Sequence, residues 1–187
     1  VKRFIYASTS SVCGVSDAEK VNEEHPLVPI TNYNKYKGLC EPILFRYQSP
    51  DFTAVTIRPA TVCGYSPRQR LDLTVNMLTN HAYDNYAVSV FGGSQIRSNI
   101  HIDDIVDLYC MLLKLPSEQI AGKIYNAGCQ NLSVADVAVR VKEMMVKENS
   151  SEKEVTIETI KSDDPRSYHI SSEKNKEELN FTPSHTV

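Results

Sequence analysis

The sequence predicts an α/β fold in which a parallel sheet is followed by a smaller α/β lobe. Short apolar runs bounded by turn residues alternate with longer stretches of helical periodicity, as expected of strands joined by crossover helices. The connection between the first two predicted strands is long enough to hold a helix, as parallel strands require. A chain of 187 residues with 41% hydrophobic content is also long enough to bury a substantial core.

The first part of the chain predicts two strands that flank a helix. Residues 1–7 (VKRFIYA) are an apolar and aromatic run that leads into a Ser/Thr cluster, which predicts a buried strand followed by a turn. Residues 33–47 predict a helix, in which Pro42 removes a backbone hydrogen bond and indicates a kink or unusually good packing. Residues 52–57 (FTAVTI) predict the second strand, which an Arg-Pro pair ends.

The rest of the chain predicts shorter, mixed elements. Helices are expected at 71–80, 103–113, 133–145 and 172–179, and strands at 88–91, 123–126 and 155–160. Asp103 and Ser133 are the expected N-caps, because short polar side chains accept hydrogen bonds from the free amides of a helix start. Asp104 is expected to interact with the helix dipole, and His101 is expected to be structural.

Composition and charge exclude several classes of protein. The formal net charge is −3, so no basic excess indicates binding to nucleic acid or to an anionic membrane. No apolar run approaches the roughly 20 residues that span a bilayer. The five cysteines are scattered and form no CxxC pair, which favours free thiols over a disulfide scaffold or zinc site. We therefore expect a cytoplasmic protein without a metal site, in which a reactive thiol at Cys13 or Cys63 is a minor alternative.

Tyr33 and Lys37 are the residues with the clearest chemical implication. Residues four apart share one helix face, so the phenol and the ammonium can point into the same cleft. A nearby cation favours a phenolate, which makes a tyrosine usable as a general acid/base. Thr9, at the end of the first strand, could bond a substrate oxygen, because open α/β sheets bind ligands at the carboxyl ends of strands. The alternative is a half-buried tyrosine beside a surface lysine.

Five segments, in this order, resemble those of a known family. They are IYASTSSVCG, NYNKYKGLCE with its YxxxK spacing, TIRPATVCG, FGGSQIRSNIHIDDIVD and DPRSYHISSEKNKEELNFTP. The chain resembles the extended short-chain dehydrogenase/reductase family, and especially its sugar-nucleotide epimerases and dehydratases such as UDP-glucose 4-epimerase-like enzymes. This resemblance implies the later part of a Rossmann-like parallel sheet with a smaller C-terminal α/β substrate-binding lobe.

The resemblance also implies roles for the matched residues. Thr9, Tyr33 and Lys37 would be catalytic, with Tyr33 as acid/base on a sugar hydroxyl and Lys37 on the nicotinamide ribose. The implied cofactor is NAD, or alternatively NADP, in contact with Ser8, Thr9, Tyr33, Lys37 and Ala60. A nucleotide diphosphate sugar would contact Ser10, Ser11, Thr61, Asp72, Leu73, Arg97 and Arg166. The two arginines would hold the diphosphate, because a planar guanidinium matches phosphate oxygens; an exposed salt bridge is the alternative for each.

The family pattern assigns domains and reveals two departures. Residues 1–70 correspond to the catalytic part of the Rossmann-like domain, and residues 71–187 mainly to the substrate lobe, with residues 95–128 returning to the first domain. No GxxGxxG or GxGxxG turn occurs, so the dinucleotide-binding half is missing and the isolated fragment is expected to be inactive. The family's VYG is VCG at Cys13, which changes a wall of the pocket.

Three functions remain open from the sequence. Family dehydratases carry acids after the catalytic threonine, where this chain has Ser10 and Ser11, so elimination is disfavoured. An NAD-dependent epimerase, which removes and returns a hydride at one sugar carbon, needs only Thr9, Tyr33, Lys37 and the cofactor. A nucleotide-sugar dehydrogenase or reductase uses the same residues and is the alternative. A non-catalytic binding or interaction fragment is the third hypothesis. The complete enzyme is expected to be a homodimer.

Overall fold

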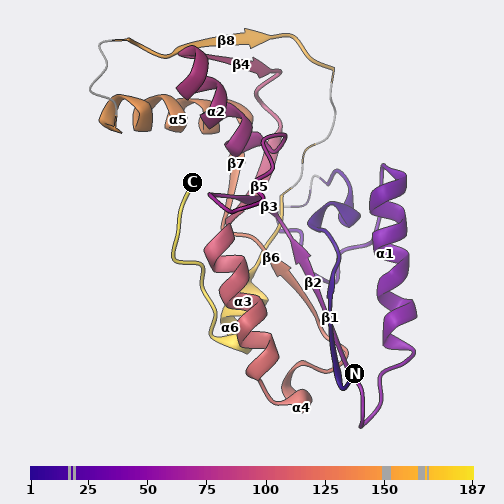
Figure 1. The fold of residues 1–187 in the computed structure, drawn as a ribbon. Coiled ribbons are helices and arrows are strands. Elements are labelled where there is room, and N and C mark those ends of the chain that lie inside the picture. The colour runs from indigo at the N-terminus through magenta and orange to yellow at the C-terminus, as the bar shows by residue number, and fades with distance from the viewer. Residues whose placement is uncertain (17, 19, 149–152, 164–166, 168) are drawn as a thin grey trace.

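A computed structural model describes residues 1–187 except 17, 19, 149–152, 164–166 and 168, and shows an elongated α/β molecule (Figure 1). A larger body contains β1, β2 and β6 with helices on both faces, and a smaller lobe holds β4 and β8 with two helices. Between them lies a second small sheet of β3, β5 and β7. The prediction of an α/β fold with parallel strands is confirmed.

The main sheet is parallel, in the order β1-β2-β6. Its strands are β1 (Arg3–Ala7), β2 (Thr53–Pro59) and β6 (Ile124–Ala127). One face carries α1 (Asn32–Phe45), and the other carries α3 (Ile102–Lys114), α4 (Ser117–Ile120) and α6 (Glu173–Leu179). The central strand β2 is buried along almost its whole length, as expected of a parallel strand covered on both faces.

The edge strand β1 is more exposed than the sequence predicts. Its residues are half-buried or exposed, none is fully buried, and Phe4 is 45% exposed. β1 pairs with β2 along one side, and in the described part of the chain no strand pairs with its other side. The apolar run of residues 1–7 therefore indicated a strand correctly, but its burial depends on what lies along that second side.

The three strands of the second sheet were not predicted from the sequence. β5 (Ile96–His101) pairs in parallel with β3 (Thr61–Cys63) and antiparallel with β7 (Gln130–Ser133). Neither β5 nor β7 was predicted, because both are rich in polar residues and lack the apolar pattern of a strand. Asn99 nevertheless is fully buried within β5, so tertiary contacts decide its conformation.

The smaller lobe has a hydrophobic core of its own. β4 (Ala87–Phe91) pairs in parallel with β8 (Thr156–Ile160), and α2 (Thr74–Asn85) packs beside α5 (Val134–Glu148). Leu78, Val88, Val137 and Val141 are among its buried residues. None of the helices in the described residues has both the length and the apolar composition needed to cross a membrane.

The structure corrects one predicted N-cap and confirms another. The N-cap of α3 is His101, not Asp103: the His101 Nδ1 accepts a hydrogen bond from the Asp103 amide at 3.3 Å. His101 therefore has the structural role that the sequence indicates. Ser133 caps α5 as predicted, since its Oγ accepts from the Asp136 amide at 3.0 Å and donates to the Asp136 carboxylate at 2.6 Å.

The C-terminal segment returns to the start of α3 and is fixed by a buried carboxylate. Asp104 accepts hydrogen bonds from the amide and hydroxyl of Ser184, at 3.0 and 2.9 Å, and from the amide and ring Nδ1 of His185, at 3.1 and 3.0 Å. Burial alone would raise the pKa of Asp104, but these hydrogen bonds outweigh it and lower that pKa. The same contact with Asp104 raises the pKa of His185 above its ordinary value.

Two of the five cysteines are buried. Cys13 and Cys63 lie inside the protein, whereas Cys40, Cys110 and Cys129 are exposed, and all five are free. Burial raises the pKa of the Cys13 thiol and of the Cys63 thiol, so both are held as thiols at neutral pH. This argues against the minor alternative of a reactive thiol at either position.

We predict that Asp104→Asn lowers the free energy of unfolding by about 1–3 kcal/mol, because buried donors lose their charged acceptor. Since the pKa of Asp104 is lowered, its contribution is present at neutral pH and is lost as pH falls below about 4. The contribution of His185 is also stabilising but has the opposite pH dependence, since it is lost as pH rises through the raised pKa of His185. Urea denaturation at pH 7 and pH 3 measures the difference, and equal stabilities at pH 7 would refute this role of Asp104.

We also predict that a chromogenic disulfide reagent modifies Cys40 and Cys110 rapidly in the folded protein and Cys129 more slowly, since the pKa of Cys129 is raised by partial burial. Cys13 and Cys63 are expected to react only after denaturation. The time course of thiol release, compared with that of Cys13→Ser, tests this. A rapid phase that disappears in Cys13→Ser would show an accessible thiol there instead.

Candidate active site

A pocket of about 870 Å³ opens at the carboxyl ends of β1 and β2. The ends of these strands meet β3, β5 and the start of α2 around it. Every predicted site residue that the structure describes lines the pocket: Ser8, Thr9, Ser10, Ser11, Tyr33, Lys37, Ala60, Thr61, Asp72, Leu73 and Arg97. Arg166 lies outside the described residues. The structure thus brings together side chains that are far apart in sequence, and their roles remain predictions.

Tyr33 and Lys37 share one face of α1, as their spacing predicts. The Lys37 Nζ lies 5.8 Å from the centroid of the Tyr33 ring and 5.3 Å from that of Tyr6. It also donates a hydrogen bond of 2.6 Å to the carbonyl oxygen of Ala7, at the end of β1. Tyr33 is 61% exposed. The ammonium is therefore held between the strand and a phenol that can reach a bound molecule.

Thr9 begins a hydrogen-bonded chain that leads back to α1. It is the N-cap of η1 (Ser10–Cys13), and its Oγ1 accepts from the Ser11 amide at 3.3 Å. The Ser11 Oγ lies 2.9 Å from the Thr9 Oγ1 and donates to the Oδ1 of buried Asn34 at 2.8 Å. Because an amide oxygen only accepts, Thr9 donates to Ser11 and presents lone pairs to the pocket. Asn34 was not identified from the sequence.

A buried ion pair lies directly behind the pocket wall. Glu41 on α1 and Arg58 on β2 are each 2% exposed and form a bidentate contact with a shortest distance of 2.7 Å. Burial opposes the charge on Arg58, but its hydrogen bonds to Glu41 and the charge of Glu41 raise the pKa of Arg58. The hydroxyl of Ser8 donates to Glu41 at 2.5 Å, so the hydrogen of the Ser8 hydroxyl is already used within the protein. The position of Glu41, four residues after Lys37, was the available sequence signal for it.

Asp72 is paired at the opposite side of the pocket. The Arg70 side chain forms two hydrogen bonds to its carboxylate, at 2.6 and 3.0 Å, and both residues are exposed. The hydrogen bonds from Arg70 lower the pKa of Asp72. Arg70 also lines the pocket and was not predicted. Arg70 is therefore a third lining cation, beside Lys37 and Arg97, and it lies close in sequence to Leu73, the residue that precedes α2.

Arg97 enters the pocket from β5, beside Ser98. Its Nη1 donates to the Ile96 carbonyl at 3.1 Å, and the buried Asn99 side chain donates to the Arg97 carbonyl at 2.8 Å. The acids proposed as alternative partners have other contacts: Asp103 lies 3.6 Å from the His101 Nδ1, and Asp104 binds the C-terminal segment. Arg97 therefore lines the pocket, and its role toward a ligand stays a prediction.

One group in the described residues brings three potential metal ligands together: His101, Asp103 and His185, with ligand atoms within 4.8 Å of one another. The two imidazole rings stack with centroids 4.5 Å apart and an interplanar angle of 27°. Stacked rings direct their nitrogen lone pairs side by side rather than at a common point. The Nδ1 atoms are also engaged with the Asp103 amide and the Asp104 carboxylate. The absence of a metal site stays a prediction.

The donor set fits one end of a dinucleotide. The ammonium of Lys37 and the hydroxyl of Tyr33 can bond ribose hydroxyls, and the small side chain of Ala60 leaves room for a flat ring against the strand end. The chain contains no glycine-rich turn of the kind that binds a pyrophosphate. The pocket therefore suits the nicotinamide-ribose half of NAD.

Comparisons with known proteins agree with this arrangement. The sequence profile of the NAD dependent epimerase/dehydratase family matches residues 1–128. The chain is 27% identical over 206 residues to UDP-arabinose 4-epimerase 1 of Arabidopsis thaliana, covering 100% of this chain and 48% of that protein. It is 28% identical over 158 residues to dTDP-D-glucose 4,6-dehydratase of Homo sapiens, covering 83% and 43%. The chain thus spans about half the length of the curated relatives it matches.

Solved structures share the fold. UDP-glucuronic acid 4-epimerase from Bacillus cereus, in complex with UDP-glucuronic acid and NAD, matches with a TM-score of 0.80 and 26% identity, over 98% of this chain and 57% of that one. dTDP-glucose 4,6-dehydratase from Bacillus anthracis, in complex with NAD, matches with a TM-score of 0.78 and 23% identity, over 97% and 57%. Because the family profile covers more than half of the sequence, the chain belongs to the NAD dependent epimerase/dehydratase family.

Proposed function

We propose that this chain is the catalytic and substrate-binding part of an NAD-dependent nucleotide-sugar epimerase. The observation that carries the proposal is the convergence of Thr9, Tyr33 and Lys37 on a pocket that Arg97 also lines. A phenol beside a cation, a hydroxyl and a guanidinium suit a neutral sugar hydroxyl joined to a diphosphate. The names of the relatives, which include epimerases and dehydratases of UDP- and dTDP-sugars, agree with that substrate class.

Each residue has a distinct part in the proposed reaction. When bound, NAD supplies the acceptor for the hydride that leaves the sugar carbon. Tyr33 is the general base that takes the proton of the sugar hydroxyl, and the ammonium of Lys37 lies beside its ring. Thr9, whose own hydrogen is directed to Ser11, can accept a hydrogen bond from a neighbouring hydroxyl of the sugar. Tyr33 then returns the proton to the same oxygen and is restored, and inversion of the carbon would require the sugar to turn its opposite face toward the bound cofactor before this return.

The distribution of carboxylates favours epimerisation over dehydration. Elimination of water requires an additional acid/base beside the sugar. Ser10 and Ser11 occupy the wall next to Thr9, and Asp72, the one carboxylate among the described lining residues, is paired with Arg70. Glu41 is close in sequence to Lys37 but its carboxylate is buried against Arg58. Proton transfer is therefore left to Tyr33.

The remaining sequence predictions belong to the same proposal. Arg97 would bind the diphosphate together with Arg166, and Ser10, Ser11, Thr61, Asp72 and Leu73 would contact the nucleotide sugar. Residues 1–70 and 95–128 would form the catalytic body and the rest of 71–187 mainly the substrate lobe. The separate core around α2 and α5 supports this division, whereas Ile170, Leu179 and Phe181 pack into the core of the larger body. A homodimer of the complete enzyme is part of the proposal.

The function is tested by incubating the full-length protein with NAD and, separately, UDP-glucose, UDP-arabinose, UDP-glucuronic acid and dTDP-glucose. Products are identified by nuclear magnetic resonance and the reduced cofactor by absorbance. An epimer formed without net cofactor reduction supports the proposal. Accumulation of reduced cofactor indicates the dehydrogenase or reductase alternative, and a 4-keto-6-deoxy product indicates a dehydratase. Absence of both turnover and binding would point to a non-catalytic fragment.

Tyr33→Phe is predicted to lower kcat by at least about 100-fold, because positioned proton transfer contributes that much or more. The KM for the nucleotide sugar should stay within a factor of about two, since the phenol acts mainly in the transition state. Tyr36→Phe is the matched control: Tyr36 lies on the same helix, is 63% exposed and is not among the residues that line the pocket. Equal rates for the two variants would remove Tyr33 from the mechanism.

Arg97→Ala is predicted to raise the KM for the nucleotide sugar by roughly 10- to 100-fold, which corresponds to the loss of one or two charge-assisted hydrogen bonds. Arg97→Lys should restore only part of the affinity, because a point charge cannot make a bidentate contact. Arg46→Ala, at the end of α1 and away from the pocket, is the control. The inhibition constants of UDP and dTDP provide the measurement; unchanged constants in Arg97→Ala would show that this residue does not bind the diphosphate.

A further inference from the structure

Tyr33, Lys37 and Glu41 form a column along one face of α1. They are spaced four residues apart, and their exposure falls along the column from the open Tyr33 to the buried Glu41. Eight residues of helix separate Glu41 from Tyr33, or about 12 Å along the axis. Glu41 therefore lies at the base of the column and does not reach a molecule bound beside Tyr33.

The carboxylate of Glu41 is fully used in binding two other segments. Its Oε1 accepts from the Ser8 Oγ at 2.5 Å and from the Arg58 Nε at 3.0 Å, and its Oε2 accepts from the Arg58 Nη2 at 2.7 Å. The remaining Nη1 of Arg58 donates to the Glu23 carbonyl at 3.1 Å. All of these bonds involve at least one charged group, which makes them short and directional.

These contacts join the three segments that carry the predicted catalytic and cofactor-binding groups. Ser8 precedes Thr9 at the end of β1, Arg58 lies two residues before Ala60 on β2, and Glu41 lies one helical turn from Lys37. The Ser8 amide also donates to the Ile57 carbonyl at 2.8 Å. One carboxylate thus fixes the helix relative to both strands.

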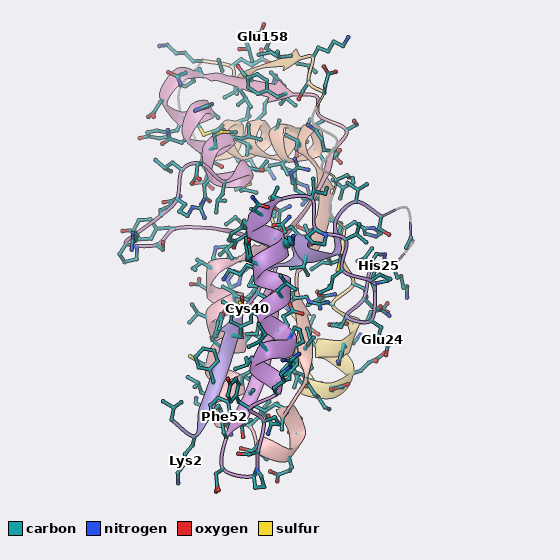
Figure 2. The ribbon with its side chains drawn as sticks, turned by 90° about the vertical axis from the view of Figure 1, so that its right-hand side faces the viewer. Lys2, Glu24, His25, Cys40, Phe52 and Glu158 are labelled. Atoms are coloured by element: carbon teal, nitrogen blue, oxygen red, sulfur yellow. The ribbon has the colours of Figure 1, made fainter. Side chains whose placement is uncertain are left out.

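Along its middle α1 buries no large apolar side chain of its own, and its backbone at Gly38 packs against Val12 and Leu27. The buried residues of this helix are Asn34, Gly38 and Glu41, and none has a large apolar side chain. Leu39 and Ile43 are exposed, and Figure 2 shows α1 on the outer face of the molecule, with Cys40 labelled on it. The helix is held by polar contacts, with Glu41 at one end and the bond from Ser11 to Asn34 at the other.

Two considerations indicate that the ion pair of Glu41 orients α1 rather than stabilises the fold. Pro42 follows Glu41 inside the helix and has no amide to donate to the carbonyl four residues earlier, so the helix is weakened there. A buried ion pair is also a poor source of stability, since well-packed apolar residues often serve as well or better. What the pair provides is a fixed orientation, which apolar contacts do not.

We propose that Glu41 is a positioning residue of the reaction. It fixes the axial position and the rotation of α1 relative to β1 and β2, so that Tyr33 and Lys37 lie beside Thr9 at the pocket. This inference rests on the proposed function. Glu41 acts through Ser8 and Arg58, and touches neither sugar nor cofactor. A shift of about 1 Å in such a group can lower the rate about 100-fold without loss of binding.

The kinetic test uses Glu41→Gln in the full-length protein, with the nucleotide sugar that the unaltered protein converts. The amide keeps the size of the side chain but loses its charge and places an NH₂ group against the donors of Arg58 or Ser8. We expect kcat to fall about 10- to 100-fold, with KM within a factor of two. Glu41→Asp, which keeps the charge on a shorter side chain, should recover part of the loss.

The control separates positioning from loss of stability. Leu112→Ala removes a fully buried side chain from α3, on the opposite face of the sheet, and destabilises the protein without touching the column. Rates are measured well below the melting temperature of every variant. A fall in kcat that is confined to Glu41→Gln supports the proposal. An unchanged kcat in Glu41→Gln, or an equal fall in Leu112→Ala, overturns it.

Amide hydrogen exchange tests the same idea without a substrate. Glu41→Gln is expected to speed exchange at least tenfold at residues 35–41 and at Ser8 and Thr9, relative to β5 amides of the same protein. Exchange that is unchanged, or faster by the same factor everywhere, contradicts the proposal. If the unaltered protein converts no nucleotide sugar, the proposed function fails, and this exchange measurement alone decides whether Glu41 fixes the helix.

Discussion

The parallel pairing of β1 with β2 is the constraint on which the site depends. Arg3 to Ala7 pair residue by residue with Thr53 to Ile57, so both strands end at the same edge of the sheet. Strand carbonyls and amides that are free at this edge are available to side chains and ligands. The Ala7 carbonyl is bonded by Lys37, and the chain continues directly into Thr9. The position of the pocket therefore follows from the register of these two strands.

Polar contacts, rather than apolar packing, align the elements around this pocket. The cores of the two bodies are formed by residues such as Ile57 and Leu108 in one and Leu78 and Val137 in the other, and neither core includes a residue of α1. Around the pocket, the fixed groups are Glu41 and the chain of hydroxyls that ends at Asn34. Hydrophobic burial stabilises the fold in proportion to area, whereas hydrogen bonds specify angles and distances. The proton transfer that we propose for this site would depend on the second property.

A large part of the fold was open to prediction because its signals are local. The strand at 1–7, the helix that begins near Tyr33 and the strand at 52–57 follow from apolar runs, turn residues and helical periodicity. β5 and β7 could not be predicted, since Arg97, Ser98 and Asn99 lack an apolar pattern and are ordered by burial between other segments. The cap of α3 was wrong for a similar reason: the imidazole of His101 accepts a bond that a sequence rule gives to Asp103.

The sequence by itself determined the residue types for which proton transfer, ribose binding and phosphate binding are proposed. It also determined the spacing that puts Tyr33 and Lys37 on one helix face. It did so because residue type and helical period are local properties. Only the tertiary structure decided which charges are available to a ligand. Glu41 and Asp72 are both carboxylates in the sequence, yet one is buried against Arg58 and the other is paired with Arg70 at the surface. The pair of Glu41 and Arg58 joins residues seventeen positions apart, and it depends on the free energy of desolvation, which exists only once the chain has folded.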